Sequence, residues 1–237
     1  MCLRSDGSGV FADDATERVW GIQDHFETLA IRLSPERLGP YKKVGAIGTQ
    51  HAITLYKWNV DISAEFYKCL SFVEVVLRNA LSSEFSRFHA ELGRAGSWLT
   101  DTEIVWSHQQ RESVQGASDL LRRQGKEVST SGLVPLLNFG FWRYLMTKRY
   151  LATYWSPVLC RVFPGVKEDE SRPLIDRLGR LHQLRNRIAH HEPIFGRRLD
   201  LDHRDCLLVL EAICPVTARW VESQSRVPEV LAVRPPL

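Results

Sequence analysis

Apolar residues recur every three or four positions along most of the chain, which is the spacing of one face of an α-helix. The segment 62–88 is the clearest case, because Phe66, Leu70 and Leu77 fall on one line while Phe72 and Val76 occupy other faces. This pattern predicts a long central helix that is buried on nearly every side. Convincing period-two alternation, the pattern of strands, is missing, so the sequence predicts an all-α fold.

Capping residues mark where the predicted helices begin. Ser34 and Pro35 have the types expected at an N-cap and at the first helical position. Thr100 and Glu103 have the spacing of a capping box, which predicts a helix over about 100–123. The other predicted helices cover 16–32, 48–58, 62–90, 132–151, 171–191 and 202–224.

The aromatic content indicates a large packed core. The 237 residues include seven Trp, ten Phe and six Tyr, and such side chains bury large areas. We therefore predict a flexible tail over residues 1–15, followed by one all-α domain over 16–237. Seven aromatic residues could stack on nucleobases but are expected to pack in the core, with judgement reserved on Trp58. These are Tyr56, Trp58, Phe139, Trp142, Tyr144, Tyr154 and Trp155.

Several classes of protein are disfavoured by what the sequence lacks. The longest apolar stretch, 133–142, is short and interrupted by Pro135, so we expect no membrane span. The N-terminal residues do not have the pattern of a secretory signal, and we expect a cytoplasmic protein. Five cysteines without a C-x-x-C pair indicate reduced, structural thiols. Nucleotide-binding loops and the motifs of zinc proteases and serine hydrolases are also missing, and no cofactor is expected.

Positive charge is concentrated in one part of the sequence. The chain has a formal net charge of +3, yet the window 177–198 holds six Arg and one Glu, which gives +5. The remainder is therefore slightly acidic, at about −2. Such a basic cluster is typical of a surface that contacts nucleic acid.

Chemistry-bearing residues lie at the end of the predicted helix over 171–191. Its apolar positions Leu181, Leu184 and Ile188 share one face, so Arg185 and His190 project elsewhere. Five positions separate the two residues, which places them about 140° apart on an ideal helix. They can still meet on one ligand at a frayed helix end or across a dimer. Arg suits phosphate oxygens and His can transfer protons near neutral pH, so the pair is sufficient in type for cleaving an RNA backbone.

Two other interpretations of this segment stay open at this point. A helix rich in Arg and His is frequently an ordinary solvated face. A metal site that combines His182, His190 or His191 with His203 is conceivable, although no carboxylates or thiols are patterned around these residues.

The run Leu184–Pro193, with the sequence LRNRIAHHEP, resembles the signature of Abi-like (abortive infection) proteins in the HEPN superfamily. That signature is an Arg, a polar residue, three further residues and then a His. Weaker landmarks of the family are matched, in the expected order, at 55–59, 74–79, 96–98 and 139–142. The resemblance spans about 45–235.

This resemblance implies a HEPN-like helical bundle with additional helices, which forms a homodimer with its two motif helices facing each other. It also implies a metal-independent endoribonuclease that acts in phage defence or as a toxin. Arg185 would steady the phosphate, Asn186 would orient the substrate and His190 would be the catalytic acid or base. The alternative is a catalytically inactive member that binds RNA or serves as a helical protein-interaction module.

Further residues are candidates for contacts with RNA, namely Arg187, His191, Arg78, Asn79 and Arg197. Glu74 and Arg78 stand four apart with the acid first, which favours an intrahelical ion pair that is either structural or a brace for the site. The expected partners are RNA and a second copy of the chain. A cognate antitoxin or a noncoding RNA is a further candidate partner.

Overall fold

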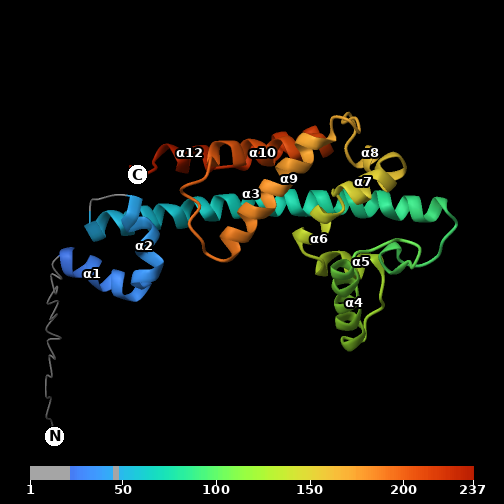
Figure 1. Ribbon diagram of the computed structural model, residues 1–237, viewed down its shortest axis with the longest axis horizontal. Coiled ribbons are helices and arrows are strands. Elements are labelled where there is room, and N and C mark those ends of the chain that lie inside the picture. The colour runs from blue at the N-terminus through green and yellow to red at the C-terminus, as the bar shows by residue number, and fades with distance from the viewer. Residues whose placement is uncertain (1–21, 45–47) are drawn as a thin grey trace, which may run out of the picture. The chain divides into compact units, whose positions relative to one another are not determined.

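The computed structural model describes residues 22–44 and 48–237, and within these residues it contains helices and no strand (Figure 1). The predicted all-α class is therefore confirmed. The chain divides into two compact units, residues 1–54 with Leu237, and residues 55–236. The predicted tail over 1–15 lies outside the described residues, and a single domain over 16–237 stays a prediction.

The first unit contains helices α1 (Ile22–Leu33) and α2 (Pro35–Val44), which Ser34 separates. The hydroxyl of Ser34 accepts a hydrogen bond from the backbone N–H of Arg37 at 3.3 Å, so the predicted start of this helix is confirmed. The beginning of the helix predicted over 16–32 lies outside the described residues. Leu38 on α2 is fully buried.

The predicted helices 48–58 and 62–90 form one continuous helix, α3 (Gly48–Glu91). Its buried residues follow a single stripe, spaced by three or four positions: Trp58, Ile62, Phe66, Leu70, Val73, Leu77, Leu81 and Phe85. Tyr67 and Val60 on other faces are 57% and 48% exposed. The expectation of burial on nearly every side was therefore wrong, because neighbouring helices pack on one side of α3 and leave other faces open.

Helix α4 (His108–Arg123) begins later than the predicted start near residue 100. Its capping box is formed by Ser107 and Gln110, whose side chains bond each other's backbone N–H. The residues before it instead form a short 3-10 helix, η1 (Trp98–Thr100). Asp101 follows η1, and its carboxylate lies in a cluster with the side chains of His89 and Arg94.

That cluster ties the loop after α3 back to the end of α3. Asp101 lies 3.1 Å from the Nε2 atom of buried His89 and 2.7 Å from a guanidinium nitrogen of Arg94. Burial alone would raise the pKa of Asp101, but the N–H of Glu103 and the guanidinium of Arg94 outweigh it and hold that pKa below its ordinary value.

The helix predicted over 132–151 is broken into several short pieces. Pro135 is incompatible with a continuous helix at this point, and the side chain of Asn138 caps a new one by accepting from the N–H of Phe141 at 3.0 Å. The pieces are α5 (Thr130–Leu133), η2 (Val134–Leu136), α6 (Phe139–Tyr144), α7 (Lys148–Tyr154), the π-helical η3 (Trp155–Leu159) and α8 (Cys160–Val162).

Helix α9 (Ser171–Ala189) matches its prediction closely and carries the Arg and His motif. The helix predicted over 202–224 is divided into α10 (Leu199–Ile213) and α11 (Pro215–Gln224), because Pro215 begins a new helix. A last helix, α12 (Val227–Ala232), lies beside α3, where the indole N–H of Trp58 donates to the carbonyl of Val230 at 2.8 Å (Figure 1).

An aromatic cluster forms much of the core of the second unit. Phe85 stacks on Trp98 with ring centroids 4.6 Å apart, and Trp98 also contacts Trp106 and Trp142. The predicted core packing is confirmed for Phe139, Trp142, Tyr154 and Trp155, and Trp58, on which judgement was reserved, is buried as well. Tyr56 and Tyr144 are half-buried instead and line pockets.

The cysteines that the structure describes form no disulfide, and Cys69 and Cys206 are buried. None of the helices within residues 22–44 and 48–237 combines the length with the apolarity that crossing a membrane requires.

Candidate functional site

The C-terminal end of α9, where the motif lies, is closed by a Schellman arrangement. The N–H of Glu192 donates to the carbonyl of Arg187 at 2.8 Å, and the N–H of His191 donates to that of Ile188 at 3.0 Å. His191 adopts a positive φ of 55°, and the Arg187 and Glu192 side chains form an ion pair at 3.5 Å. The helix end is therefore well defined rather than frayed, and the exposed residue at its C-cap is His190.

The chain that leaves the motif is fixed to α3 by one buried side chain. Asn59 is 4% exposed, and its Oδ1 atom accepts from the backbone N–H groups of Ile194 at 2.8 Å and Phe195 at 3.2 Å. Pro193 lies between these bonds and the helix end. Sequence reasoning placed Asn59 in a family landmark but assigned it no role, because the partner N–H groups are distant in the chain.

Arg185 lies near a carboxylate from α3. Burial raises the pKa of Glu74, whereas Arg185, Arg78 and the backbone N–H of Phe139 act in the opposite direction. The charges of both arginines therefore act on Glu74, which is half-buried. This fits the interpretation of Glu74 as a brace for the site.

Arg185 and Asn186 line a polar pocket of about 440 Å³ between α4, α6 and α9. His182 and Arg143 also line it, and the Nδ2 atom of Asn186 lies 3.4 Å from Nε2 of His182. Among the residues that the structure describes, no Asp or Glu lines this pocket. The pocket therefore presents positive charge and hydrogen-bond donors without a facing carboxylate.

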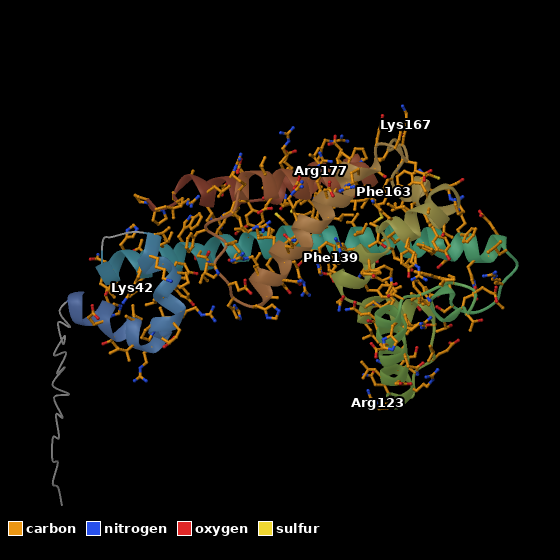
Figure 2. The ribbon with its side chains drawn as sticks, viewed as in Figure 1. Lys42, Arg123, Phe139, Phe163, Lys167 and Arg177 are labelled. Atoms are coloured by element: carbon orange, nitrogen blue, oxygen red, sulfur yellow. The ribbon has the colours of Figure 1, made fainter. Side chains whose placement is uncertain are left out.

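His182 is a pocket residue to which sequence reasoning gave no role beyond a candidate metal ligand. It packs against Phe139, whose ring lies edge-on at 5.9 Å where α6 meets α9 (Figure 2). Burial lowers the pKa of His182, and the charges of Arg143 and Arg185 lower it further. A signal was present in the sequence, since His182, Arg185 and Asn186 have the i, i+3, i+4 spacing that puts side chains on one helix face.

His190 is not among the residues that line the pocket of Arg185. The structure therefore brings Arg185 and Asn186 together and leaves His190 on a separate, exposed surface of the same chain. The neighbouring His191 lines a different and mostly apolar pocket of about 390 Å³, together with Tyr56 and Tyr67 of α3.

The other residues predicted to contact RNA lie in different surroundings. Arg78 and Asn79 line a separate pocket of about 470 Å³ against η2. Arg197 is 19% exposed and forms a two-pronged ion pair with buried Asp202, with both N–O distances at 2.8 Å. Its guanidinium is therefore already occupied in this structure, and a contact with RNA stays a prediction.

The basic window has less uncompensated charge than the sequence suggested. Arg177 (Figure 2) and Arg180 both pair with buried Asp205 of α10, at 3.3 and 2.7 Å. Arg198 pairs with Asp200 at 3.2 Å. The formal +5 of the window is therefore partly compensated by acids of α10, which packs on α9 and begins just beyond the window.

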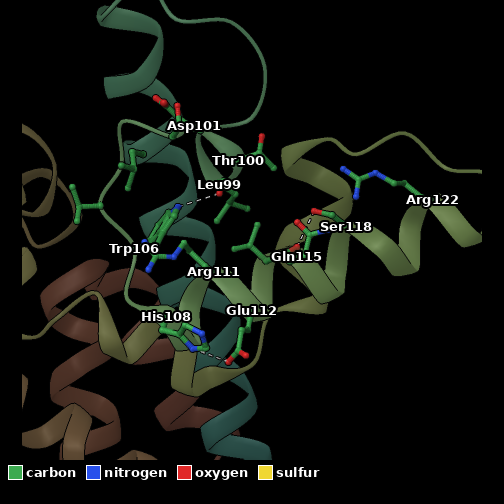
Figure 3. Close-up of a pocket in the computed structure, with 14 residues that line it drawn as sticks. Leu99, Thr100, Asp101, Trp106, His108, Arg111, Glu112, Gln115, Ser118 and Arg122 are labelled. Carbon is green, nitrogen blue, oxygen red and sulfur yellow. Dashed lines mark hydrogen bonds and ion pairs between the residues drawn. The ribbon is translucent and has the colours of Figure 1, made fainter.

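A larger cavity than the one that Arg185 lines is found away from the motif. It has a volume of about 850 Å³ and lies between η1 with its following loop and α4 (Figure 3). Charges on its rim face each other, as His108 and Glu112 do at 3.3 Å, and Asp101 also lines it. It contains no residue of the predicted site.

Within the described residues, no group of three or more His, Cys, Asp or Glu side chains is close enough together to hold a metal ion. Comparison of the chain with models of known protein families, with curated proteins and with solved structures gave no match.

Proposed function

We propose that the chain is a HEPN-type endoribonuclease that cleaves RNA without a metal ion, as a homodimer, in phage defence or as a toxin. The observation that carries this proposal is the carboxylate-free pocket lined by Arg185 and Asn186, one turn before the exposed His190 at a rigid helix end. The phage-defence role rests on the resemblance of Leu184–Pro193 to the Abi-like signature.

In the proposed reaction, the ribose 2′-oxygen attacks the adjacent phosphorus and the 5′-oxygen of the next nucleotide leaves. The product is a cyclic phosphate. Arg185 stabilises the charge that develops on the phosphoryl oxygens, because a guanidinium donates two parallel hydrogen bonds to such oxygens. His190 removes the proton from the 2′-hydroxyl or supplies one to the leaving oxygen.

A homodimer accounts for the separation of Arg185 and His190 within one chain. Two facing copies of α9 would let His190 of one copy act on a phosphate held by Arg185 of the other. Two histidines would then also be present in the cleft, one to accept and one to donate a proton.

The test is cleavage of single-stranded RNA by the purified protein in excess EDTA. Wild type should cleave, His190→Ala should lose the activity, and both should unfold at the same temperature because His190 is exposed. The matched control is His108→Ala, an exposed histidine on α4 whose side chain is 81% accessible, which should cleave normally. Loss of wild-type cleavage on adding EDTA would contradict the proposed mechanism.

A second candidate is an RNA-binding protein of the same family that has no catalytic activity. It is favoured by the absence of His190 from the pocket that Arg185 lines. In that case wild type and His190→Ala would be equally inactive, both would bind RNA, and Arg185→Gln would weaken the binding.

A further inference from the structure

One of the residues that line the pocket between α4, α6 and α9 carries a buried amide donor without a partner. Gln110 is 3% exposed, and its Oε1 atom accepts from Tyr150 and from the backbone N–H and hydroxyl of Ser107. These donors fix the orientation of the amide. Its Nε2 atom is buried and has no hydrogen-bond partner among the described residues. Since an unpaired buried donor is costly, this atom points to an acceptor supplied by a ligand.

The charges around the same pocket specify the kind of acceptor. Arg143 on α6 and Arg185 on α9 line it and both lie near His182, whose pKa they lower. Among the described residues the nearby carboxylate of Glu74 does not line the pocket. Two guanidiniums and an amide donor suit an anion with several oxygens, such as a phosphate group, which the planar fork of Arg matches with two parallel hydrogen bonds.

Two glycines lie beside these side chains at the junction of α6 and α9. A Cβ atom at Gly140 would lie 3.1 Å from Nε2 of His182, and one at Gly179 would lie 3.4 Å from a guanidinium nitrogen of Arg143. The missing Cβ at Gly140 thus leaves room for His182, whereas Gly179 lies at ordinary contact distance from Arg143. The pocket is therefore built into the packing of the helices and does not depend on a mobile loop.

We propose that this pocket binds the phosphate group of a nucleotide through Arg143, Arg185 and the Nε2 atom of Gln110. The nucleotide is either part of a bound RNA strand, in which case this phosphate is the scissile one that Arg185 holds in the proposed reaction, or a free mononucleotide. The first source rests on the proposed function, and the second does not. The volume of about 440 Å³ is within the range of about 300–1,000 Å³ that small-molecule sites have.

The experiment measures, by calorimetry on the full chain, the binding of three probes. They are inorganic phosphate, adenosine 5′-monophosphate and a short single-stranded RNA that is 2′-O-methylated and therefore cannot be cleaved. Two variants test the pocket: Gln110→Glu, which keeps the Oε1 acceptor and replaces the donor by an oxygen, and Arg143→Gln. Each has a control with the same change in charge outside the pocket, Gln124→Glu at the C-cap of α4 and Arg149→Gln on α7.

The pocket variants should bind adenosine monophosphate and phosphate about tenfold more weakly or worse, as expected when a hydrogen bond to a charged group is lost. The controls should bind as wild type does. Arg143→Gln removes a half-exposed side chain, so it keeps the test valid if Gln110→Glu fails to fold.

The outcomes separate this proposal from the proposed function. If the pocket variants lose affinity for RNA to the same extent as for adenosine monophosphate, RNA is the source of the phosphate. Loss of mononucleotide binding alone, with RNA bound normally or not at all, identifies a free nucleotide. If the folded pocket variants bind all three probes as tightly as their controls do, the pocket assignment is overturned. This holds even where RNA cleavage is observed.

Discussion

Asn59 and Ile194 are joined by a buried hydrogen bond of 2.8 Å, in which the side-chain oxygen of Asn59 accepts from the backbone N–H of Ile194. The bond connects the N-terminal part of α3 to the segment that follows the motif helix, across 135 positions of sequence. It therefore fixes the direction in which the chain leaves His190 and His191. The segment that follows the candidate catalytic histidine is therefore held against α3.

Replacement of Asn59 by Ala should destabilise the protein, because two buried N–H groups lose their acceptor. The expected cost is about 1–3 kcal/mol for buried donors left unpaired. In thermal unfolding, each kcal/mol corresponds to roughly 2–4 °C in a domain of this size. The exposed Asn79 on the same helix is the control, and Asn79→Ala should unfold as wild type does. Equal melting temperatures for the two variants would contradict the role given to Asn59.

The positive φ of His191 predicts an unusual order of stability among its variants. His191→Gly and His191→Val both remove the imidazole, but a β-branched residue is strained in the left-handed conformation and glycine is not. The Gly variant should therefore be more stable than the Val variant by about 1–2 kcal/mol. Chemical denaturation measures the difference. A Val variant as stable as the Gly variant would show that the Schellman end of α9 does not form.

The surroundings of His182 predict how it titrates. Burial, with help from Arg143 and Arg185, lowers the pKa of His182 below its ordinary value of 6.5, so the neutral imidazole persists in the folded protein. The unfolded chain takes up a proton first as the pH falls through 6.5, so this residue makes the folded state less stable below that pH. NMR of the imidazole should report a midpoint below 6.5, and Arg143→Gln should raise it. A midpoint that Arg143→Gln leaves unchanged would contradict the pocket geometry.

Much of the fold could be predicted from the sequence, because periodicity and capping are local properties. Helix α9 and the start of α2 were placed closely. The start of α4 was predicted too early because Thr100 and Glu103 have the spacing of a capping box without forming one. Asp101, which lies between them, instead pairs with His89 and Arg94. Such a long-range ion cluster leaves no signal in the local pattern.

The candidate site could be predicted only in part, because contacts between different helices leave no signal in the local sequence pattern. The sequence indicates that Arg185 and Asn186 share a helix face, and the same spacing includes His182. Arg143 and Gln110 join them through the packing of α6 and α4, which no spacing within one helix reveals. The partial compensation of the basic window's charge was not predicted, because the compensating acids lie on α10, which begins just after the window ends.

The central claim is that Arg185 and His190 act on one RNA phosphate from facing copies of the chain. Inactive Arg185→Ala and inactive His190→Ala subunits should each fail to cleave single-stranded RNA in EDTA. Their mixture should regain part of the wild-type rate, because a mixed dimer contains one cleft with an intact Arg185 and an intact His190. The measurement is the cleavage rate of the mixture after exchange of subunits has been verified. A mixture that forms mixed dimers and stays inactive, beside an active wild type, would contradict the claim.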